Sequence, residues 1–324
     1  MKRHTPFIEF IATYALSVAV YFCALSLVFP GYFSPLWPHH SDFYILTDLA
    51  HAPGGIKSII SGVRPVGYSF AYVIGHLGLH GAIACIIGIG IFNATVLALL
   101  ARRAFDVPLS GSYILLLIAY FFAIYSSPAF YVFYTHDVFA QLSLSLLLLG
   151  AVVYIRVSNT TVLGASFALA SFCLAAFLSK ETFILAALMI STAYLLISKQ
   201  SLKVRIPPVV IVAVAGVASM IQQRHSGSAF ISGAGAYQIS FAPWPILNEF
   251  FRYVGGALNQ FTIAASLIAA VTLLWRSDRQ RTFAMAAALL AAAGLALVPN
   301  SLLLKHFYLG YAIGASYIFF LLFL

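Results

Sequence analysis

Lys180 and Glu181 are the residues whose types and spacing most strongly suggest chemistry. They stand next to each other in the segment Leu-Ser-Lys-Glu-Thr, between two apolar runs at 161–178 and 182–197. Ionisable side chains beside apolar spans are costly unless they pair with each other or reach a hydrated cavity. The segment therefore suggests a charged pair that points into a shared polar cavity. A local ion pair that closes the turn between two helices stays open as the alternative.

Two further candidates lie in the first long connection of the chain. Asp42 follows the turn Pro38-His39-His40-Ser41, so it is either a site acid or the N-cap of a helix that begins at Phe43. Arg64 precedes Pro65 at the start of an apolar segment. Its guanidinium has the planar donor geometry that binds phosphate or carboxylate, whereas its aliphatic stem suits an anchor at a membrane surface. Both interpretations of each residue stay open.

Other polar side chains mark the points where the chain enters or leaves apolar runs. Asp137 follows His136 directly before the run at 138–155, where it either caps a helix or joins a site. Arg252 lies in the second long connection, where it flanks a Gly/Ala/Ser stretch at 226–236. Lys305 and His306 precede the last apolar run and provide either ligand contacts or an anchor for it. We count all four as candidate substrate-binding residues.

The histidines and acids raise the question of a metal. No helix-spaced ligand motif such as H-E-x-x-H is present, so we expect no fixed transition-metal site. Asp and Glu side chains are the ligands that hard divalent cations prefer. No cofactor is required by the sequence, and a divalent cation held by carboxylates is the one that stays open.

Composition identifies the elements that must position these residues. The chain has 324 residues, of which 62% are hydrophobic and 8% are charged. A soluble domain is usually about 25% charged, so this chain lacks the polar side chains to cover a water-facing surface. Its three cysteines, Cys23, Cys85 and Cys173, fall inside apolar runs, which excludes a disulfide scaffold. The composition predicts an all-α polytopic membrane protein.

The apolar runs predict about ten transmembrane helices of about 20 residues each. A shorter apolar stretch at 66–80 contains His76 and His80, which favours an interfacial or re-entrant helix over a full crossing. Short segments at 43–46 and 56–60 suit helices that lie along the membrane surface. The predicted spans are 8–29, 82–101, 111–127, 138–155, 161–178, 182–197, 207–222, 258–275, 283–298 and 307–324.

The distribution of Lys and Arg predicts the orientation. With the N-terminus in the cytoplasm, 11 of the 17 Lys and Arg residues fall in cytoplasmic segments, in agreement with the positive-inside rule. Five of the eight acids and eight of the nine histidines then lie on the outer face. The net charge of +9 is thus a topology signal, whose partners are membrane lipids and not nucleic acid.

A single transmembrane domain over 1–324 is expected, with its longest connections at 30–65 and 223–257 on the outer face. Loops carry function when a rigid scaffold positions them, so we expect the working face to be extracytoplasmic. The sequence ends at Leu324 within an apolar run, which suggests either a short protein or a truncated one.

The order of these features resembles the C-type integral-membrane glycosyltransferase superfamily, especially bacterial relatives of protein O-mannosyltransferases and lipid A aminoarabinose transferases. The matching features are Asp42, the segment Gly62-Val63-Arg64-Pro65-Val66-Gly67-Tyr68, and an apolar span that contains Asn93 and ends in Leu100-Ala101-Arg102-Arg103-Ala104-Phe105. His136-Asp137 and Leu178-Ser179-Lys180-Glu181-Thr182 follow in order. The resemblance covers most of residues 1–200. One departure is Ser41, because many relatives have two adjacent acids there.

The resemblance implies a transferase that moves a sugar from a polyprenyl-phosphate donor to an acceptor outside the cytoplasm. The acceptor would be an envelope glycan, lipid or protein, and the location a bacterial inner membrane with a periplasmic active site. Asp42 would be the general base of an inverting displacement. Arg64, Lys180, Arg252, Lys305 and His306 would stabilise the phosphate, with Glu181 and Asp137 in support. A transporter or flippase of a lipid-linked or anionic substrate is the alternative.

Overall fold

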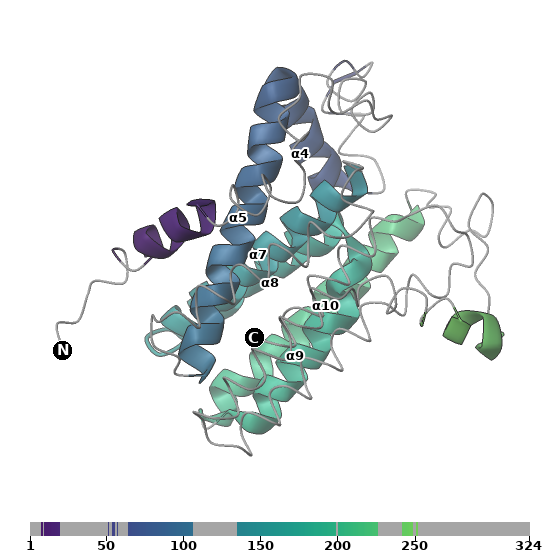
Figure 1. Cartoon of the computed structure of the whole chain (residues 1–324). Coiled ribbons are helices and arrows are strands. Elements are labelled where there is room, and N and C mark those ends of the chain that lie inside the picture. The colour runs from purple at the N-terminus through teal and green to yellow at the C-terminus, as the bar shows by residue number, and fades with distance from the viewer. Residues whose placement is uncertain are drawn as a thin grey trace.

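The computed structural model describes residues 8, 10–19, 51, 54–55, 57, 64–105, 135–198, 200–225, 242–248 and 251. Over these positions the regular elements are helices, and no strand occurs among them. Figure 1 shows α4 and α5 meeting at the top of the view, from where α5 runs down past α7 and α8. The labelled elements are α4 (Pro65–Gly75), α5 (Gly78–Phe105), α7 (Thr135–Val157), α8 (Val162–Ser179), the 3-10 helix η2 (Glu181–Phe183), α9 (Ile184–Ile197) and α10 (Leu202–His225).

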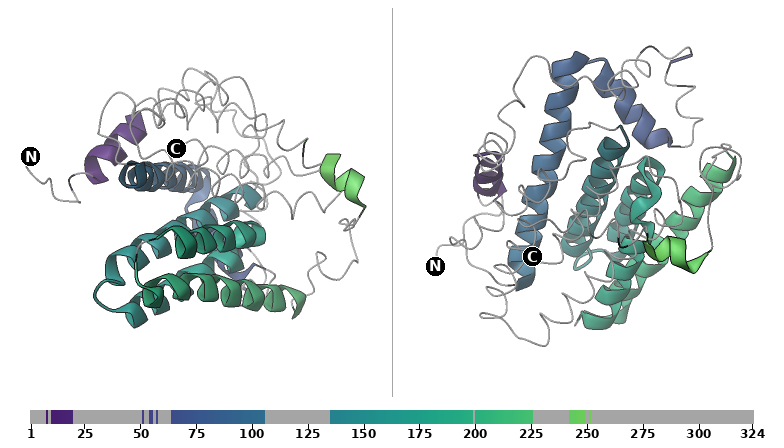
Figure 2. Two further views of the ribbon diagram at one scale, coloured as in Figure 1. Left: turned by 90° about the horizontal axis from the view of Figure 1, so that it is seen from below. Right: turned by 45° about the vertical axis from the view of Figure 1, so that its right-hand side comes forward.

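Helix α8 is the centre of the packed bundle. It contacts α7 along one side and α10 along the other, while α9 packs on α10 and α5 packs on α7. Both views of Figure 2 show α7 to α10 lying side by side. Small residues allow these helices to approach closely: a Cβ at Gly150 would meet Phe172 at 2.9 Å, and one at Gly216 would meet Ile184 at 2.8 Å. Close packing through small residues is characteristic of helices in membranes.

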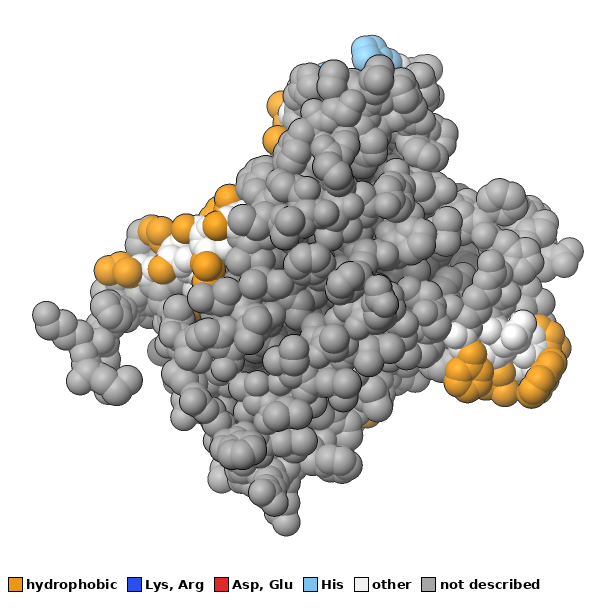
Figure 3. Space-filling model, viewed as in Figure 1, with side chains coloured by type: hydrophobic (Ala, Val, Ile, Leu, Met, Phe, Trp, Pro, Cys, Tyr) orange, Lys and Arg blue, Asp and Glu red, His pale blue; other side chains and the backbone are white. Residues whose placement is uncertain are grey.

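Among the residues that the structure describes, two helices are long and apolar enough to cross a membrane, Val162–Ser179 and Leu202–Gln223. Only 33% of each of these segments is buried inside the protein. Large apolar side chains are exposed along both, including Leu163 and Phe167 on α8 and Val210, Val214 and Val217 on α10. Apolar side chains are also exposed on the helix over 10–19 and on the segment around 243–248 (Figure 3). Such surface is extensive for a water-soluble protein and suits contact with lipid.

The helical class agrees with the sequence prediction. Each predicted run from 138–155 to 207–222 coincides with a helix, and the run at 8–29 includes a helix over 10–19. The count of ten spans and the orientation stay predictions. The runs at 111–127, 258–275, 283–298 and 307–324 lie outside the described residues.

Two predicted boundaries were wrong. The stretch at 66–80 is not one helix, because α4 ends at Gly75 and α5 begins at Gly78, whose φ of 69° breaks the helical path. The last helix of the bundle begins at Leu202 and not at 207, with Pro207 and Pro208 inside it. A proline normally disrupts a helix interior, because it removes one backbone hydrogen bond.

Tyr154 supplies a donor at the proline pair. Pro208 has no N–H to donate to the carbonyl of Val204, four residues earlier. The hydroxyl of Tyr154 on α7 donates to that carbonyl at 2.7 Å, and the Tyr154 side chain is buried. The hydroxyl thus replaces the missing backbone donor and joins α7 to α10.

We expect Tyr154→Phe to lower the free energy of unfolding by about 1–2 kcal/mol, because a buried carbonyl loses its donor. In a Pro208→Ala background the backbone N–H returns, so the same change should cost less. Thermal unfolding in detergent of the unaltered protein, the two single variants and the double variant measures this difference. Equal costs in both backgrounds would contradict the role assigned to the hydroxyl.

The exposed face of α10 gives a test of membrane insertion. Val214 lies at the middle of α10 and Leu202 at its first residue, and both side chains are more than half exposed, at 63% and 58%. A lysine at the centre of a spanning helix costs about 3 kcal/mol, whereas one at the end reaches the headgroups. We therefore expect Val214→Lys, but not Leu202→Lys, to reduce the membrane-inserted fraction. Equal insertion of the two variants would argue that α10 does not cross lipid.

Candidate functional site

The ends of five helical elements meet around Lys180 and Glu181. The first residues of α4, the last residues of α8 and α10, and η2 all contribute side chains there. Helix α7 joins them near its start, because the hydroxyl of Ser179 donates to the carbonyl of Phe139 at 3.1 Å. The local cause is the backbone of Lys180, which is extended at φ −157° and ψ 123° and separates α8 from η2.

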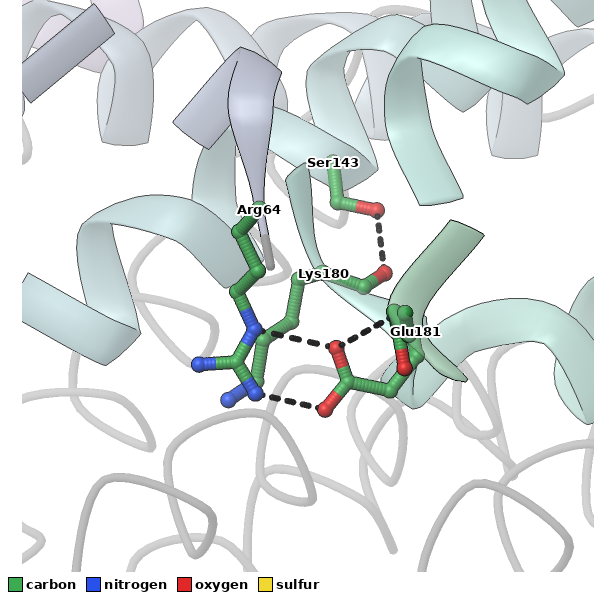
Figure 4. Close-up of polar contacts among 5 residues, drawn as sticks. Arg64, Ser143, Lys180 and Glu181 are labelled. Carbon is green, nitrogen blue, oxygen red and sulfur yellow. Dashed lines mark hydrogen bonds and ion pairs between the residues drawn. The ribbon is translucent and has the colours of Figure 1, made fainter. Parts of the chain in front are cut away.

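Arg64 and Glu181 form a two-point ion pair across 117 residues of sequence. The Nε of Arg64 donates to Oε2 of Glu181 at 3.0 Å, and its Nη2 donates to Oε1 at 2.6 Å (Figure 4). Each side chain is 14% exposed. Paired donors on a carboxylate fix both distance and orientation, which a lysine cannot do. The pair therefore connects α4 to η2 in one defined geometry.

Lys180 is fully buried, with an exposed fraction of 0%. Figure 4 shows its side chain extending toward the same side of the site as the guanidinium of Arg64. Its positive charge acts on the Glu181 carboxylate together with that of Arg64. The described part of this cluster thus contains two cations, Arg64 and Lys180, and one anion, Glu181.

Glu181 is held as a carboxylate by these neighbours. Burial alone would raise its pKa, but the charges of Arg64 and Lys180 and the hydrogen bonds from Arg64 together hold the pKa well below its ordinary value. The amide nitrogen of Gln223 on α10 donates to Oε2 at 3.4 Å. A carboxylate with so low a pKa is a weak proton acceptor, so Glu181 is suited to positioning and not to general base catalysis.

Two serine hydroxyls secure the backbone beneath the charged residues. Ser179 of α8 donates to Phe139 of α7, and Ser143 of α7 donates to the carbonyl of Lys180 at 3.3 Å. Both serines are fully buried. Sequence reasoning did not identify them, nor Gln223. The polar segment Gln222-Gln223-Arg224-His225 at the end of α10 was the available signal for the glutamine.

The structure brings together three of the candidate residues, Arg64, Lys180 and Glu181. Local pairing between Lys180 and Glu181 alone does not describe the geometry, because the hydrogen-bonded ion pair of Glu181 is with Arg64. Asp137 falls in the first turn of α7, two residues before Phe139, and its side chain lies outside what the structure describes. Asp42, Arg252, Lys305 and His306 also lie outside the described residues.

A polar contact between α5 and α7 lies beside the site. The amide of Asn93 donates to the carbonyl of Gln141 at 3.0 Å, and Ser145 donates to Oδ1 of Asn93 at 2.6 Å. Asn93 is fully buried. Hydrogen bonds of this kind hold apolar helices in register. They therefore fix α5 on α7, whose first turns border the charged cluster.

The chemistry available to this cluster is anion recognition. A buried lysine and a guanidinium next to it create a positive potential, which a phosphate or carboxylate can occupy. Among the residues that the structure describes, no group of three or more His, Cys, Asp or Glu side chains is placed to hold a metal ion. A scan against protein-family models, a search of curated proteins and a search of solved structures each find no match to this chain.

Proposed function

We propose that this protein is a membrane glycosyltransferase that transfers a sugar from a polyprenyl-phosphate donor to an extracytoplasmic acceptor. The observation that carries the proposal is the convergence of Arg64 on Lys180 and Glu181, from opposite ends of the part of the chain that resembles the C-type superfamily. An isolated interfacial anchor would need neither a bidentate partner nor a buried lysine beside it. The cluster is suited to a phosphate group at the end of a helical bundle.

The proposed reaction is an inverting displacement. The acceptor hydroxyl loses its proton to Asp42 as its oxygen attacks the anomeric carbon. The bond from that carbon to the phosphate oxygen breaks, and its electron pair stays on the phosphate. A phosphate leaving group needs little protonation, so one carboxylate suffices as base, provided that positive charge stabilises the group that leaves.

The residues divide these tasks according to their burial. Arg64 is partly exposed, so its guanidinium is the group assigned to contact the phosphate. Lys180 is fully buried and acts through its charge. Glu181 positions Arg64. Asp137, Arg252, Lys305 and His306 remain candidates for contacts to donor and acceptor, and a divalent cation at the phosphate is compatible with the scheme.

Purified protein in liposomes, given a polyprenyl-phosphate sugar with a labelled sugar and a membrane extract as acceptor, tests the proposal. We expect labelled product from the unaltered protein and none from Asp42→Asn, with equal amounts of inserted protein. Lys203→Gln, an exposed lysine at the other end of α10, is the matched control and should retain activity. Movement of the labelled donor between leaflets without covalent product would favour a flippase. Product that is unaffected by Asp42→Asn would remove Asp42 as the base.

A further inference from the structure

We infer that Gly67 is a positioning residue that sets the distance between Arg64 and Glu181. Because Gly67 has no side chain, the first turn of α4 can pack against Phe139 of α7 and Ser179 of α8. The geometric inference stands on the described contacts. Its consequence for sugar transfer rests on the proposed function.

A side chain at Gly67 would make contacts that are tighter than most Cβ contacts in proteins. A Cβ built there would lie 3.0 Å from Cγ of Phe139, 3.1 Å from its Cδ1, and 3.0 Å from the carbonyl oxygen of Ser179. These distances are shorter than ordinary van der Waals contact, so either the neighbours or α4 must move when a methyl group is added. The outcome depends on whether the neighbours can yield.

The neighbours are held from several sides. Ser179 donates its hydroxyl to Phe139, and the next residue is fixed by the N–H of Lys180 on Ala176 at 2.9 Å and by Ser143 on the Lys180 carbonyl. The Phe139 ring is fully buried and packs edge-on against Tyr68, with ring centroids 5.3 Å apart. Close-packed interiors transmit such strain and do not absorb it. Addition of a methyl group should therefore displace α4.

A displacement of α4 passes directly to Arg64. The N–H of Tyr68 donates to the carbonyl of Arg64 at 2.9 Å, so Arg64 is tied to the first turn of the helix that contains Gly67. Its hydrogen bonds to Glu181 are short and directional, at 2.6 Å and 3.0 Å. Such bonds weaken steeply as distance and angle change. Gly67 thus acts on the site through Arg64 and does not contact the substrate.

A double-mutant cycle measures this effect without any assay of function. The coupling between Arg64→Gln and Glu181→Gln is determined by equilibrium unfolding of the full chain in detergent, with and without Gly67→Ala. We expect Gly67→Ala to lower the coupling constant between the two substitutions about tenfold. Gly88→Ala is the matched control, since a Cβ at Gly88 on α5 meets no atom within 4 Å among the described residues. Coupling that Gly67→Ala leaves unchanged would overturn the inference.

The acid sensitivity of the variant gives a readout that a general loss of stability would not move. If Arg64 recedes, the pKa of Glu181 rises toward its ordinary value, so the acid-induced loss of stability in Gly67→Ala should be smaller than in the unaltered protein and should be complete at a higher pH. Gly88→Ala should keep the original profile. Identical profiles for the two alanine variants would contradict the role of Gly67.

Ser179→Ala provides a second variant in case Gly67→Ala yields no folded protein. It removes the hydrogen bond from the Ser179 hydroxyl to the Phe139 carbonyl, which helps to hold both neighbours of Gly67, and should weaken the same coupling about threefold; unchanged coupling would count against the inference. If the unaltered protein transfers no sugar but Gly67→Ala weakens the coupling, the proposed function fails and the inference stands. If transfer is observed but the coupling is intact in Gly67→Ala, the inference fails and the proposed function stands.

Discussion

Replacement of Glu181 by glutamine is expected to lower the free energy of unfolding by about 3 kcal/mol, because it removes one partner of a largely buried ion pair. The change leaves Arg64 and Lys180 close together without the carboxylate that both act on. Arg64→Gln should cost less, since the charge of Lys180 still acts on Glu181. Equilibrium unfolding in detergent measures both, and the double variant should recover part of the loss. A larger cost for Arg64→Gln than for Glu181→Gln would contradict this assignment of charges.

The pH dependence follows from the lowered pKa of Glu181. In the unfolded chain the pKa of a glutamate is about 4.3. Stabilisation by the ionised carboxylate is therefore complete above that pH, and it is lost as the pH falls further toward the lowered folded-state pKa. The difference in unfolding midpoint between the unaltered protein and Glu181→Gln should be constant from about pH 8 to pH 5.5 and should shrink below about pH 4.3. A decrease between pH 7 and 5.5 would mean that burial, not pairing, governs this carboxyl group.

The largest effect on activity is expected at Arg64. Arg64→Gln should reduce sugar transfer about 100-fold, because one preorganised donor to a developing anion contributes a factor of this order. Steady-state transfer from a labelled polyprenyl-phosphate sugar is the measurement. Lys180→Gln should reduce transfer less, since Lys180 is fully buried and acts only through its charge.

Arg64→Lys separates geometry from charge at this position. It keeps the positive charge but cannot make the two parallel bonds to Glu181, so it should recover only a small part of the lost rate. Lys203→Gln should keep full activity, because Lys203 is exposed at the opposite end of α10. Full activity of Arg64→Lys would mean that charge alone is needed, and full activity of Arg64→Gln would exclude Arg64 from the site.

The helices of the bundle could be predicted from the sequence because their apolar runs are long and end at polar residues. The ends of the runs at 138–155 and 161–178 fall within three residues of the ends of α7 and α8, which is the precision that such runs allow. The start of α10 could not be placed, because Pro207 and Pro208 resemble a helix boundary. Tyr154 on another helix supplies the donor there, and no local pattern reveals such a distant contact.

The charged residues of the site were recognisable by type, but their partners were not. Lys180 and Glu181 are conspicuous because few ionisable residues interrupt the apolar sequence. The partner of Glu181 is Arg64, which lies 117 positions away, and only the packing of α4 against α8 brings the two together. Gly67 and Ser179 stand in segments that carry the resemblance, but no role was predicted for them or for Ser143, because glycine and serine are common in membrane helices for packing alone.

The long sequence separation of Arg64 and Glu181 has a consequence for the order of assembly. Within the bundle, α7 packs on the next helix, α8, and α9 packs on the next helix, α10, and such local contacts form early because they close short loops. Helix α4 must close a much longer loop before Arg64 reaches Glu181. We therefore expect α4 to dock last, onto a bundle of α7 to α10 that already presents Lys180 and Glu181. Partly folded chains would then contain the bundle without the ion pair between Arg64 and Glu181.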